Sequence, residues 1–290
     1  MAATAQPSFE PDVTHKLPFA CRQSGSELEL HVTTATGSVG SKAVVIIPAR
    51  LHSTRLPRKL LLRETGRTLI QHTYEAAARA RRSDQVWVAA DSEEIAAAVR
   101  EFGGHVFLTS PDHPSGSDRI AEVARSWPEF DLIVNVQGDE PEVAGADIDH
   151  VIQLLDQNPS AVMSTLATPI RTHEKLLDPA CVKVVVDQQQ RALYFSRSPI
   201  PHPRSWSDDL LTADPPHFLQ HIGLYAYRRE FLLQFPTLPR SAMEQLESLE
   251  QLRVLHAGYT ILVGITEQAA KGIDTPADYQ AFVERWKNRK

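Results

Sequence analysis

The stretch Ala43-Val44-Val45-Ile46-Ile47-Pro48-Ala49-Arg50 is a continuous apolar run that ends at a proline and leads into a basic loop. Apolar runs without alternation are typical of parallel strands that are buried on both faces of a sheet. Downstream, helical patterns alternate with further short apolar runs, over residues 68–82, 85–90, 92–102, 105–108, 117–127 and 131–136. This β-α-β-α-β order predicts an α/β fold in which one parallel sheet has helices on both faces.

The two ends of this core have different patterns. Residues 1–41 contain three prolines and many small polar residues, which predicts an extension that does not order itself, although a short strand over 28–32 stays open. A targeting helix is the rival interpretation, but presequences are rich in arginine and poor in acids, unlike this segment. After about residue 160 the pattern indicates strands over 161–170, 182–187, 192–195, 219–227 and 260–265, with helices over 243–256 and from Pro276.

Composition and charge exclude several functional classes. The formal net charge of -6 argues against a surface for nucleic-acid phosphates, because such a surface needs a basic face. The sequence has no apolar run of about 18 residues that would span a bilayer, and its first residues lack the order of a secretory signal. Cys21 and Cys181 lie far apart in dissimilar contexts, which indicates neither a disulfide framework nor a thiolate metal site. We therefore expect a cytoplasmic enzyme without a membrane or nucleic-acid partner.

The loop from Arg50 to Lys59 places four cations and two hydroxyls directly after the first apolar strand. Guanidinium groups bind phosphate oxygens bidentately, and a lysine supplies a mobile charge. A solvated basic loop is the plain alternative, but ligands of open α/β sheets bind beyond the carboxyl ends of the strands. The loop lacks the glycines and the Gly-Lys-Ser/Thr ending of a Walker A motif, so we expect side chains to hold the phosphates.

Two acidic motifs are candidates for a magnesium site. In Asn135-Val136-Gln137-Gly138-Asp139-Glu140-Pro141 an apolar strand runs directly into Asp139, and Mg²⁺ prefers one or two carboxylates together with substrate phosphates. The alternative for Asp139 is a turn residue that bonds its own backbone. In Gly272-Ile273-Asp274-Thr275-Pro276, Asp274 either caps the following helix or acts as the partner of Asp139.

The segment from Asp112 to Arg119 opens a helix. Its small residues Ser115 and Gly116 let a ligand approach the helix N-terminus, and Arg119 adds a planar donor for a base or a phosphate. Plain helix capping by Ser115 or Ser117 is the alternative.

Together these segments resemble the 3-deoxy-manno-octulosonate cytidylyltransferase family, also called CMP-Kdo synthetase, from Ala43 to about Trp286. The motifs that carry the resemblance are Val45-Ile46-Ile47-Pro48-Ala49-Arg50, Ser53-Thr54-Arg55-Leu56-Pro57, Asp112-His113, Ser115-Gly116, Asn135-Val136-Gln137-Gly138-Asp139-Glu140-Pro141, Ala192-Leu193-Tyr194-Phe195-Ser196-Arg197, His221-Ile222-Gly223-Leu224-Tyr225, Leu249-Glu250-Gln251-Leu252-Arg253 and Asp274-Thr275-Pro276. The resemblance implies a Rossmann-like nucleotide-diphospho-sugar transferase fold over residues 42–290. It has three α/β/α layers and a smaller β-rich dimerisation subdomain within about 160–240.

The implied reaction transfers CMP from CTP to the anomeric hydroxyl of Kdo and releases pyrophosphate, for lipopolysaccharide biosynthesis, in a magnesium-dependent homodimer. The resemblance assigns Arg50, Ser53 and Lys59 to the triphosphate, Ser115, Gly116 and Arg119 to the nucleoside, and Asp139 and Asp274 to magnesium. Arg50, Lys59, Asp139 and Asp274 form the implied catalytic set. The sugar pocket comprises Arg55, Gln137, His221, Tyr225, Glu250 and Gln251, with Arg55 suited to the sugar carboxylate.

Sequence context alone favours ordinary roles for two of these residues. A lone histidine in an apolar strand, such as His221, is typically a satisfied core residue. Glu250 lies on a predicted helix where Leu246, Leu249 and Leu252 mark the core stripe, so an exposed salt-bridging glutamate is the ordinary interpretation. The resemblance reverses both interpretations.

The chain also departs from the family pattern. Arg58 stands where the family usually has glycine, and Leu60 stands where it usually has proline, so Arg58 either stiffens the loop or adds a phosphate contact. Ser117-Asp118 replaces a common Thr-Glu pair. Two alternatives to the Kdo reaction stay open. One is CMP transfer to another acidic sugar, either 8-amino-Kdo or a sialic acid, and the other is a catalytically silent nucleotide-binding homologue.

Overall fold

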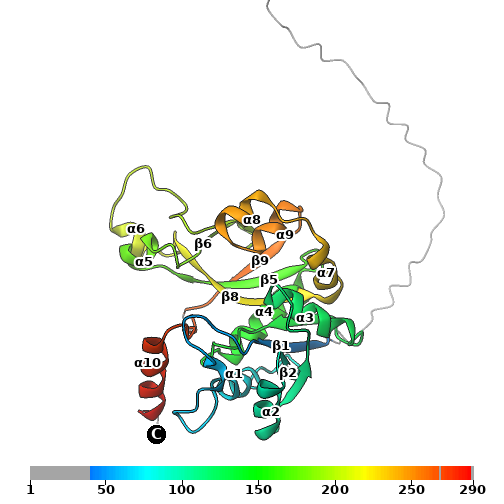
Figure 1. The fold of residues 1–290 in the computed structure, drawn as a ribbon. Coiled ribbons are helices and arrows are strands. Elements are labelled where there is room, and N and C mark those ends of the chain that lie inside the picture. The colour runs from blue at the N-terminus through cyan, green and yellow to red at the C-terminus, as the bar shows by residue number, and fades with distance from the viewer. Residues whose placement is uncertain (1–39, 268, 289–290) are drawn as a thin grey trace, which may run out of the picture. The chain divides into compact units, whose positions relative to one another are not determined.

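The strands of the described residues belong to one mixed sheet (Figure 1). The computed structural model describes residues 40–267 and 269–288. The strand order is β3 (His105–Leu108), β2 (Gln85–Ala90), β1 (Ala43–Ala49), β4 (Leu132–Asn135), β8 (Leu219–Arg228), β5 (Met163–Pro169) and β9 (Ile261–Ile265). Strand β8 runs antiparallel to its neighbours β4 and β5, and the other pairs on this path are parallel. The α/β fold class is confirmed, although β8 makes the sheet mixed.

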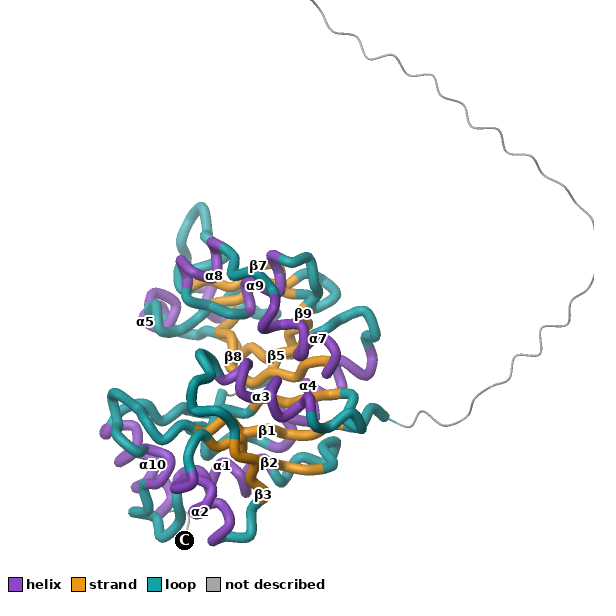
Figure 2. Tube along the Cα trace, turned by 45° about the vertical axis from the view of Figure 1, so that its right-hand side comes forward, coloured by secondary structure: helices purple, strands orange, loops and turns teal. Residues whose placement is uncertain are grey.

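Strand β1 is buried because both faces of the sheet are covered by helices. Val45 and Ile47 pack into one hydrophobic cluster, whereas Val44 and Ile46 pack into the other. The first cluster includes residues of α1 (Leu69–Ala77), α2 (Glu93–Glu101), α4 (Gly145–Gln157) and α10 (Pro276–Lys287). The second includes residues of α3 (Gly116–Arg125), α7 (Arg229–Gln234) and α9 (Gln251–His256). The result is the expected arrangement of three α/β/α layers (Figure 2).

The segment between residues 160 and 240 adds strands to the same sheet. It contains β5 and β8, together with β6 (Lys183–Val186) and β7 (Ala192–Ser196), which form an antiparallel pair that joins β8 through β6. The short helices α5 (His173–Leu177) and α6 (Asp209–Thr212) lie in this segment too. The described residues all belong to one compact unit. That this segment serves in dimerisation stays a prediction.

The helices of the structure differ from the predicted ones at several places. The helix expected over 243–256 is two helices, α8 (Ala242–Glu247) and α9, because Ser248 adopts a left-handed conformation with φ 53° and ends α8. Leu246, assigned to the core stripe, is 86% exposed, whereas Leu249 and Leu252 are buried as expected. Helix α4 was not predicted, although Ile148, Ile152 and Leu155 have the spacing of a buried helical face.

Several expectations concern residues that the structure does not describe. The extension over residues 1–39, its possible strand over 28–32, and Cys21 lie outside the described residues. Cys181 is a free, buried cysteine. Within residues 40–267 and 269–288, no helix is both long enough and apolar enough to cross a membrane.

The topology places three loops at one edge of the sheet. Strands β1, β4, β5 and β9 all point the same way, because β5 and β4 are both antiparallel to β8. The basic loop follows β1, the Asp139 segment follows β4, and the Asp274 segment follows β9. The backbone N–H of Ile273 donates to the carbonyl of Asp139 at 2.9 Å, so the last two segments are joined directly. Ligands of such sheets bind at this edge.

Candidate active site

The basic loop approaches the sheet edge through a short 3-10 turn, η1 (Lys59–Leu61). Leu60 is buried, and the loop packs closely against Gly138. A Cβ at Gly138 would lie 3.0 Å from the Pro48 carbonyl oxygen and 3.4 Å from the Leu60 side chain. Gly138 therefore allows the basic loop and the Asp139 segment to meet.

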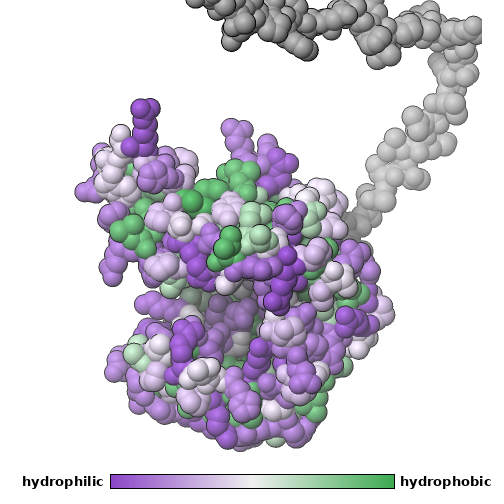
Figure 3. Space-filling model, turned by 45° about the horizontal axis from the view of Figure 1, so that its top comes forward, coloured by the Kyte–Doolittle hydropathy of each residue, from purple (hydrophilic) through white to green (hydrophobic). Residues whose placement is uncertain are grey.

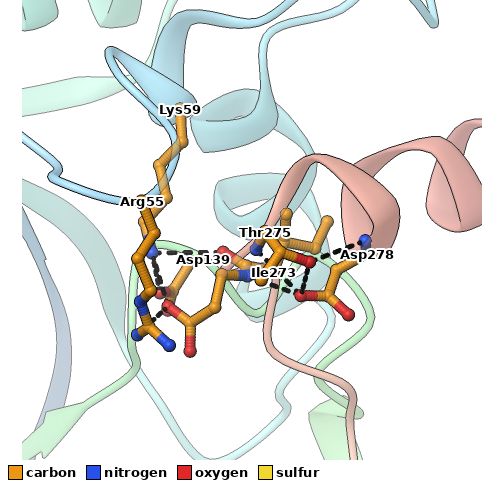
Figure 4. Close-up of polar contacts among 7 residues, drawn as sticks. Arg55, Lys59, Asp139, Ile273, Thr275 and Asp278 are labelled. Carbon is orange, nitrogen blue, oxygen red and sulfur yellow. Dashed lines mark hydrogen bonds and ion pairs between the residues drawn. The ribbon is translucent and has the colours of Figure 1, made fainter.

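Lys59 joins the two carboxylates that were expected to bind magnesium (Figure 4). Its ammonium makes a short contact with Asp139 and donates to Asp274 Oδ1 and to the Ile273 carbonyl, each at 3.1 Å. Only 14% of the Lys59 side chain is exposed. Arg55 extends toward the same place, and its Nη2 lies 3.0 Å from Asp274 Oδ1. The structure thus brings Lys59, Asp139, Asp274 and Arg55 together around one point.

Asp274 does not itself cap α10, which was the alternative from sequence. Thr275 is the N-cap, and its side chain accepts a hydrogen bond from the Asp278 backbone N–H. Asp278 completes a capping box by accepting from the backbone N–H of Thr275 at 2.8 Å. Because these two residues satisfy the helix terminus, the Asp274 carboxylate is available to Lys59 and Arg55.

Asp139 and Glu140 have different electrostatic surroundings. Glu140 Oε2 is enclosed and has no hydrogen-bond partner among the described residues. Burial, followed by the negative charges of Asp139 and Asp147, raises the pKa of Glu140 to about 8. Of the two neighbouring acids in the motif, Asp139 is therefore the one that presents a carboxylate to the cations.

The first of two adjoining cavities, which we call the basic cavity, has a volume of about 360 Å³. Among the predicted site residues, its lining includes Arg50, Ser53, Lys59, Ser115, Gly116, Gln137, Asp139 and Glu250. Figure 3 shows the molecule deeply hollowed by a cleft with hydrophilic walls. Cations from the loop after β1 and donors from the start of α3 thus face a common space, which suits an anionic ligand.

The N-terminus of α3 combines the two roles considered from sequence. Ser115 is the N-cap, since its side chain accepts from the Asp118 backbone N–H, and it also lines the basic cavity. Ser117 Oγ donates to Glu250 Oε2 at 2.9 Å, which ties α3 to the segment between α8 and α9. Gly116 lies between them and lines both cavities.

Arg119 lies behind this helix terminus and is not exposed at all. Its Nη1 donates to the Ser110 carbonyl at 3.0 Å and to the Thr109 hydroxyl, whereas its Nε and Nη2 have no partner among the described residues. Burial lowers the pKa of the Arg119 guanidinium. Arg119 lines neither cavity, so its assignment to the nucleoside stays a prediction.

Arg58 points away from the phosphate side of the loop. Its φ is 56°, a left-handed conformation that glycine adopts without cost, and its guanidinium pairs with Glu94 of α2. Arg58 is not among the residues that line the basic cavity, whereas Leu60 is. The contacts therefore favour the interpretation that Arg58 braces the loop.

The second cavity, which we call the polar-aromatic cavity, has a volume of about 320 Å³ and shares Gly116, Gln137 and Glu250 with the basic cavity. Its further lining includes the predicted residues His221, Tyr225 and Gln251. Gln251 Nε2 is enclosed without a partner among the described residues. Buried amide groups are rarely left unpaired, so this donor is suited to a polar ligand.

His221 is a half-buried histidine that also faces this cavity. Its Nε2 lies 3.1 Å from Thr165 Oγ1, and its ring contacts Phe195 edge to face at a centroid distance of 5.1 Å. Burial lowers the pKa of His221 to about 3, so the ring is neutral near pH 7. Burial also raises the pKa of the Tyr225 hydroxyl well above its ordinary value. The cavity thus offers neutral hydrogen-bonding groups.

Sequence reasoning missed several residues that line the polar-aromatic cavity, among them Tyr227, Phe235 and Ser248. Tyr227 has the period of two that links it to Tyr225 on strand β8, which was a usable signal. Ser248 carried no such sequence signal, because it lines the cavity only as a result of the break between α8 and α9.

Comparisons with known proteins bear on this site. Residues 44–261 match the family model described as cytidylyltransferase. A 3-deoxy-manno-octulosonate cytidylyltransferase of Rhodopirellula baltica is 51% identical over 84% of this chain and 98% of its own length. The Escherichia coli protein of the same name is 44% identical over 82% of this chain and 93% of its own length.

The chain belongs to the 3-deoxy-manno-octulosonate cytidylyltransferase family.

A solved structure of this family has the same fold. It is a CMP:2-keto-3-deoxy-manno-octonic acid synthetase in complex with CTP, 42% identical, with a TM-score of 0.80 over 86% of this chain and all of that chain. The cytidylyltransferase model begins in β1 and ends at Ile261, so it spans the basic loop and Asp139. Asp274 lies beyond the matched residues, and its link to this site comes from the contact with Lys59.

Proposed function

We propose that the protein transfers CMP from CTP to Kdo and releases pyrophosphate. The observation that carries this proposal is the meeting of Asp139 and Asp274 at Lys59, which lines the basic cavity together with Asp139. The basic cavity is lined by cations and suits a triphosphate. Apart from Glu250, the polar-aromatic cavity is lined by neutral polar and aromatic groups and suits a sugar. The relatives from Rhodopirellula baltica and Escherichia coli are named for this reaction, as 3-deoxy-manno-octulosonate cytidylyltransferases.

The reaction asks the protein for positioning and charge rather than for a covalent intermediate. The sugar hydroxyl attacks the α-phosphorus of CTP and gives its proton to water, and the bond to the pyrophosphate oxygen breaks, so that pyrophosphate leaves. Arg50, Ser53 and Lys59 bind the triphosphate from the loop after β1, and Ser115 and Gly116 bind at the N-terminus of α3. Holding both substrates in one geometry supplies much of the rate enhancement.

We further propose a magnesium ion at Asp139 and Asp274. The donor set fits, because both carboxylates converge on a single cationic group, the Lys59 ammonium, and Mg²⁺ prefers one or two carboxylates with phosphate oxygens. When bound, the ion would lower the pKa of the sugar hydroxyl and neutralise charge on the leaving pyrophosphate. Lys59 already holds the two carboxylates near each other.

The acceptor is held, in this proposal, by the residues of the polar-aromatic cavity together with Arg55. Arg55 is 67% exposed on its side chain and reaches Asp274, so a sugar carboxylate can meet its guanidinium beside the ion-pair cluster. His221, Tyr225, Glu250 and Gln251 provide hydrogen bonds to the sugar hydroxyls. Because His221 is neutral near pH 7, it contributes a hydrogen bond and not a positive charge.

The test is pyrophosphate release from CTP with Mg²⁺ and one acceptor at a time. Kdo, 8-amino-Kdo and sialic acid are compared in parallel reactions. We expect Kdo to have the highest kcat/KM of the three. Higher turnover with either of the other sugars would reassign the acceptor. Absence of turnover with all three, despite CTP binding, would favour the silent homologue.

We also propose a cytoplasmic homodimer. A reaction that consumes CTP needs the compartment where this nucleotide is made. The segment expected to dimerise carries the exposed side chains Leu177, Leu193 and Trp206, at 55%, 60% and 41% exposure. Large exposed apolar side chains are typical of association surfaces when they cluster. Sedimentation of the wild type and of Leu193→Asp tests this, and a monomeric wild type would contradict it.

A further inference from the structure

Glu250 and Gln251, which supply an acid and an amide to the polar-aromatic cavity, lie at a break between helices α8 and α9. Helix α8 ends at Glu247, Ser248 is left-handed with φ 53° and ψ 49°, and α9 begins at Gln251 with Glu250 as its N-cap. Ser248, Leu249, Glu250 and Gln251 all line the cavity. A left-handed non-glycine residue costs free energy and persists only where surrounding contacts hold it.

Glu247 connects this break to the β6–β7 hairpin. Its Oε1 accepts from Ser196 Oγ at 2.6 Å, and its Oε2 accepts from the Arg197 backbone N–H at 2.9 Å. Its carbonyl accepts from Arg197 Nε at 2.7 Å. Three hydrogen bonds therefore hold the residue that directly precedes Ser248.

The hairpin side of this connection is itself held by a buried lysine. Lys183 is fully buried, and its ammonium donates to the carbonyls of Arg197, Asp178 and Cys181, the last two at 3.0 and 2.7 Å. Arg197 Nη1 also donates to the Pro179 carbonyl at 3.1 Å. The Ser196–Arg197 turn is thus fixed from the hairpin and can act as a support for Glu247.

A different contact joins α8 to α9 away from the break. Arg253 donates to the Glu244 carboxylate through Nε and Nη2, and the two side chains are 8% and 7% exposed. Such a buried pair stabilises the packing of the two helices. The Glu244 carbonyl also accepts from the backbone N–H groups of Ser248 and Leu249. Among these contacts, those of Glu247 are the ones that tie the break to the β6–β7 hairpin.

We propose that Glu247 is a positioning residue that sets the affinity for the acceptor sugar. By tying the end of α8 to Ser196 and Arg197, it places Glu250 and Gln251 in the polar-aromatic cavity. Glu247 is not among the residues that line either cavity, so it acts through the residues that follow it. The inference rests on the proposed acceptor site.

The test compares Glu247→Ala, Glu247→Gln and Ser196→Ala in steady-state kinetics with both substrates varied. Losing two hydrogen bonds of ordinary strength should raise the acceptor KM about tenfold in Glu247→Ala. KM for CTP and kcat should change by less than about twofold, because the basic cavity keeps its residues. Glu247→Gln keeps one acceptor oxygen and should lie between wild type and Glu247→Ala.

Ser196→Ala gives a second measurement that removes no charge. It should raise the acceptor KM less than Glu247→Ala does. Adding it to Glu247→Ala should raise that KM by less than Ser196→Ala does alone, because the shared bond is already lost and only the Ser198 N–H contact with Ser196 Oγ is removed in addition. It also keeps the proposal testable if Glu247→Ala does not fold. A matched control is Ser241→Ala, which removes the N-cap at the opposite end of α8 and should lower stability without changing the acceptor KM.

Three outcomes overturn the positioning role: an unchanged acceptor KM in the Glu247 variants, an equal rise in both KM values, or the same rise in Ser241→Ala. Failure of the proposed function is distinguishable, because wild-type protein would then bind CTP without acceptor turnover.

Discussion

The two cavities of the cleft are built in opposite ways. The basic cavity takes its charged groups from loops and a helix terminus, and its residues Lys59 and Asp139 remain partly exposed. The polar-aromatic cavity takes its groups from strand β8 and the α8–α9 break, where His221 and Tyr225 are held neutral by burial. Charge placed on loops can follow a reacting phosphate, whereas buried neutral groups fix a shape. Changes in the first should therefore lower kcat, and changes in the second should raise the acceptor KM.

The largest effect is expected for Asp139→Asn. This change keeps the size of the side chain but removes the charge that pairs with Lys59, and kcat should fall about a thousandfold. The measurement is pyrophosphate release, with thermal unfolding to verify the fold. Glu101→Gln is the control, because Glu101 forms an exposed ion pair with Arg63 and such pairs contribute little. A kcat in Asp139→Asn within about tenfold of wild type would contradict the assignment.

Arg55 lines neither cavity: it pairs with Asp274, which contacts Lys59 of the basic cavity, yet it is assigned to the sugar. A charge-assisted hydrogen bond contributes about 2 kcal/mol, so Arg55→Ala should raise the acceptor KM about thirtyfold while KM for CTP changes little. Arg55→Lys should show a smaller rise, because lysine keeps the charge but not the paired donors. If KM for CTP rises instead, Arg55 belongs to the basic cavity.

The neutrality of His221 predicts a pH dependence of stability. Its pKa is about 3 in the folded protein against about 6.5 when unfolded, so the unfolded chain binds the proton first as pH falls. The contribution is present above pH 6.5 and is lost as pH falls toward 3, by about 2 kcal/mol between pH 7 and 5. Denaturant unfolding should show a shallower acid decline for His221→Gln. If the unfolding free energy falls equally with pH in wild type and in His221→Gln, then His221 takes up its proton equally well in the folded and the unfolded protein.

The basic cavity was more accessible to sequence reasoning than its neighbour. The unbroken apolar run of β1 revealed a doubly buried strand, and the charged residues after it and after β4 then had to meet at one edge. Asp139 and Asp274 do lie at one place, where both contact Lys59, but that contact depends on side-chain geometry that no pattern carries. Their shared role in binding magnesium stays a prediction.

The polar-aromatic cavity depends on a helix break and on long-range contacts, neither of which can be seen in the spacing of apolar residues. Leu246, Leu249 and Leu252 have helical spacing, yet Leu246 is 86% exposed because Ser248 interrupts the helix. The contacts of Glu247 with Ser196 and Arg197 span about fifty residues of sequence, with separations of 51 and 50. Local patterns do not encode such long-range contacts, and the complete burial of Arg119 was missed for the same reason.

The smallest effect is expected for Arg58→Gly, which places glycine at a left-handed position. Glycine removes the left-handed strain at φ 56°, but it also increases the entropy of the unfolded chain and removes the exposed pair with Glu94. These opposing terms should leave the unfolding free energy within about 1 kcal/mol of wild type. KM for CTP should stay within about twofold, because Arg58 does not line the basic cavity. A large rise in that KM would instead make Arg58 a phosphate ligand, and the basic cavity would then hold one more mobile cation.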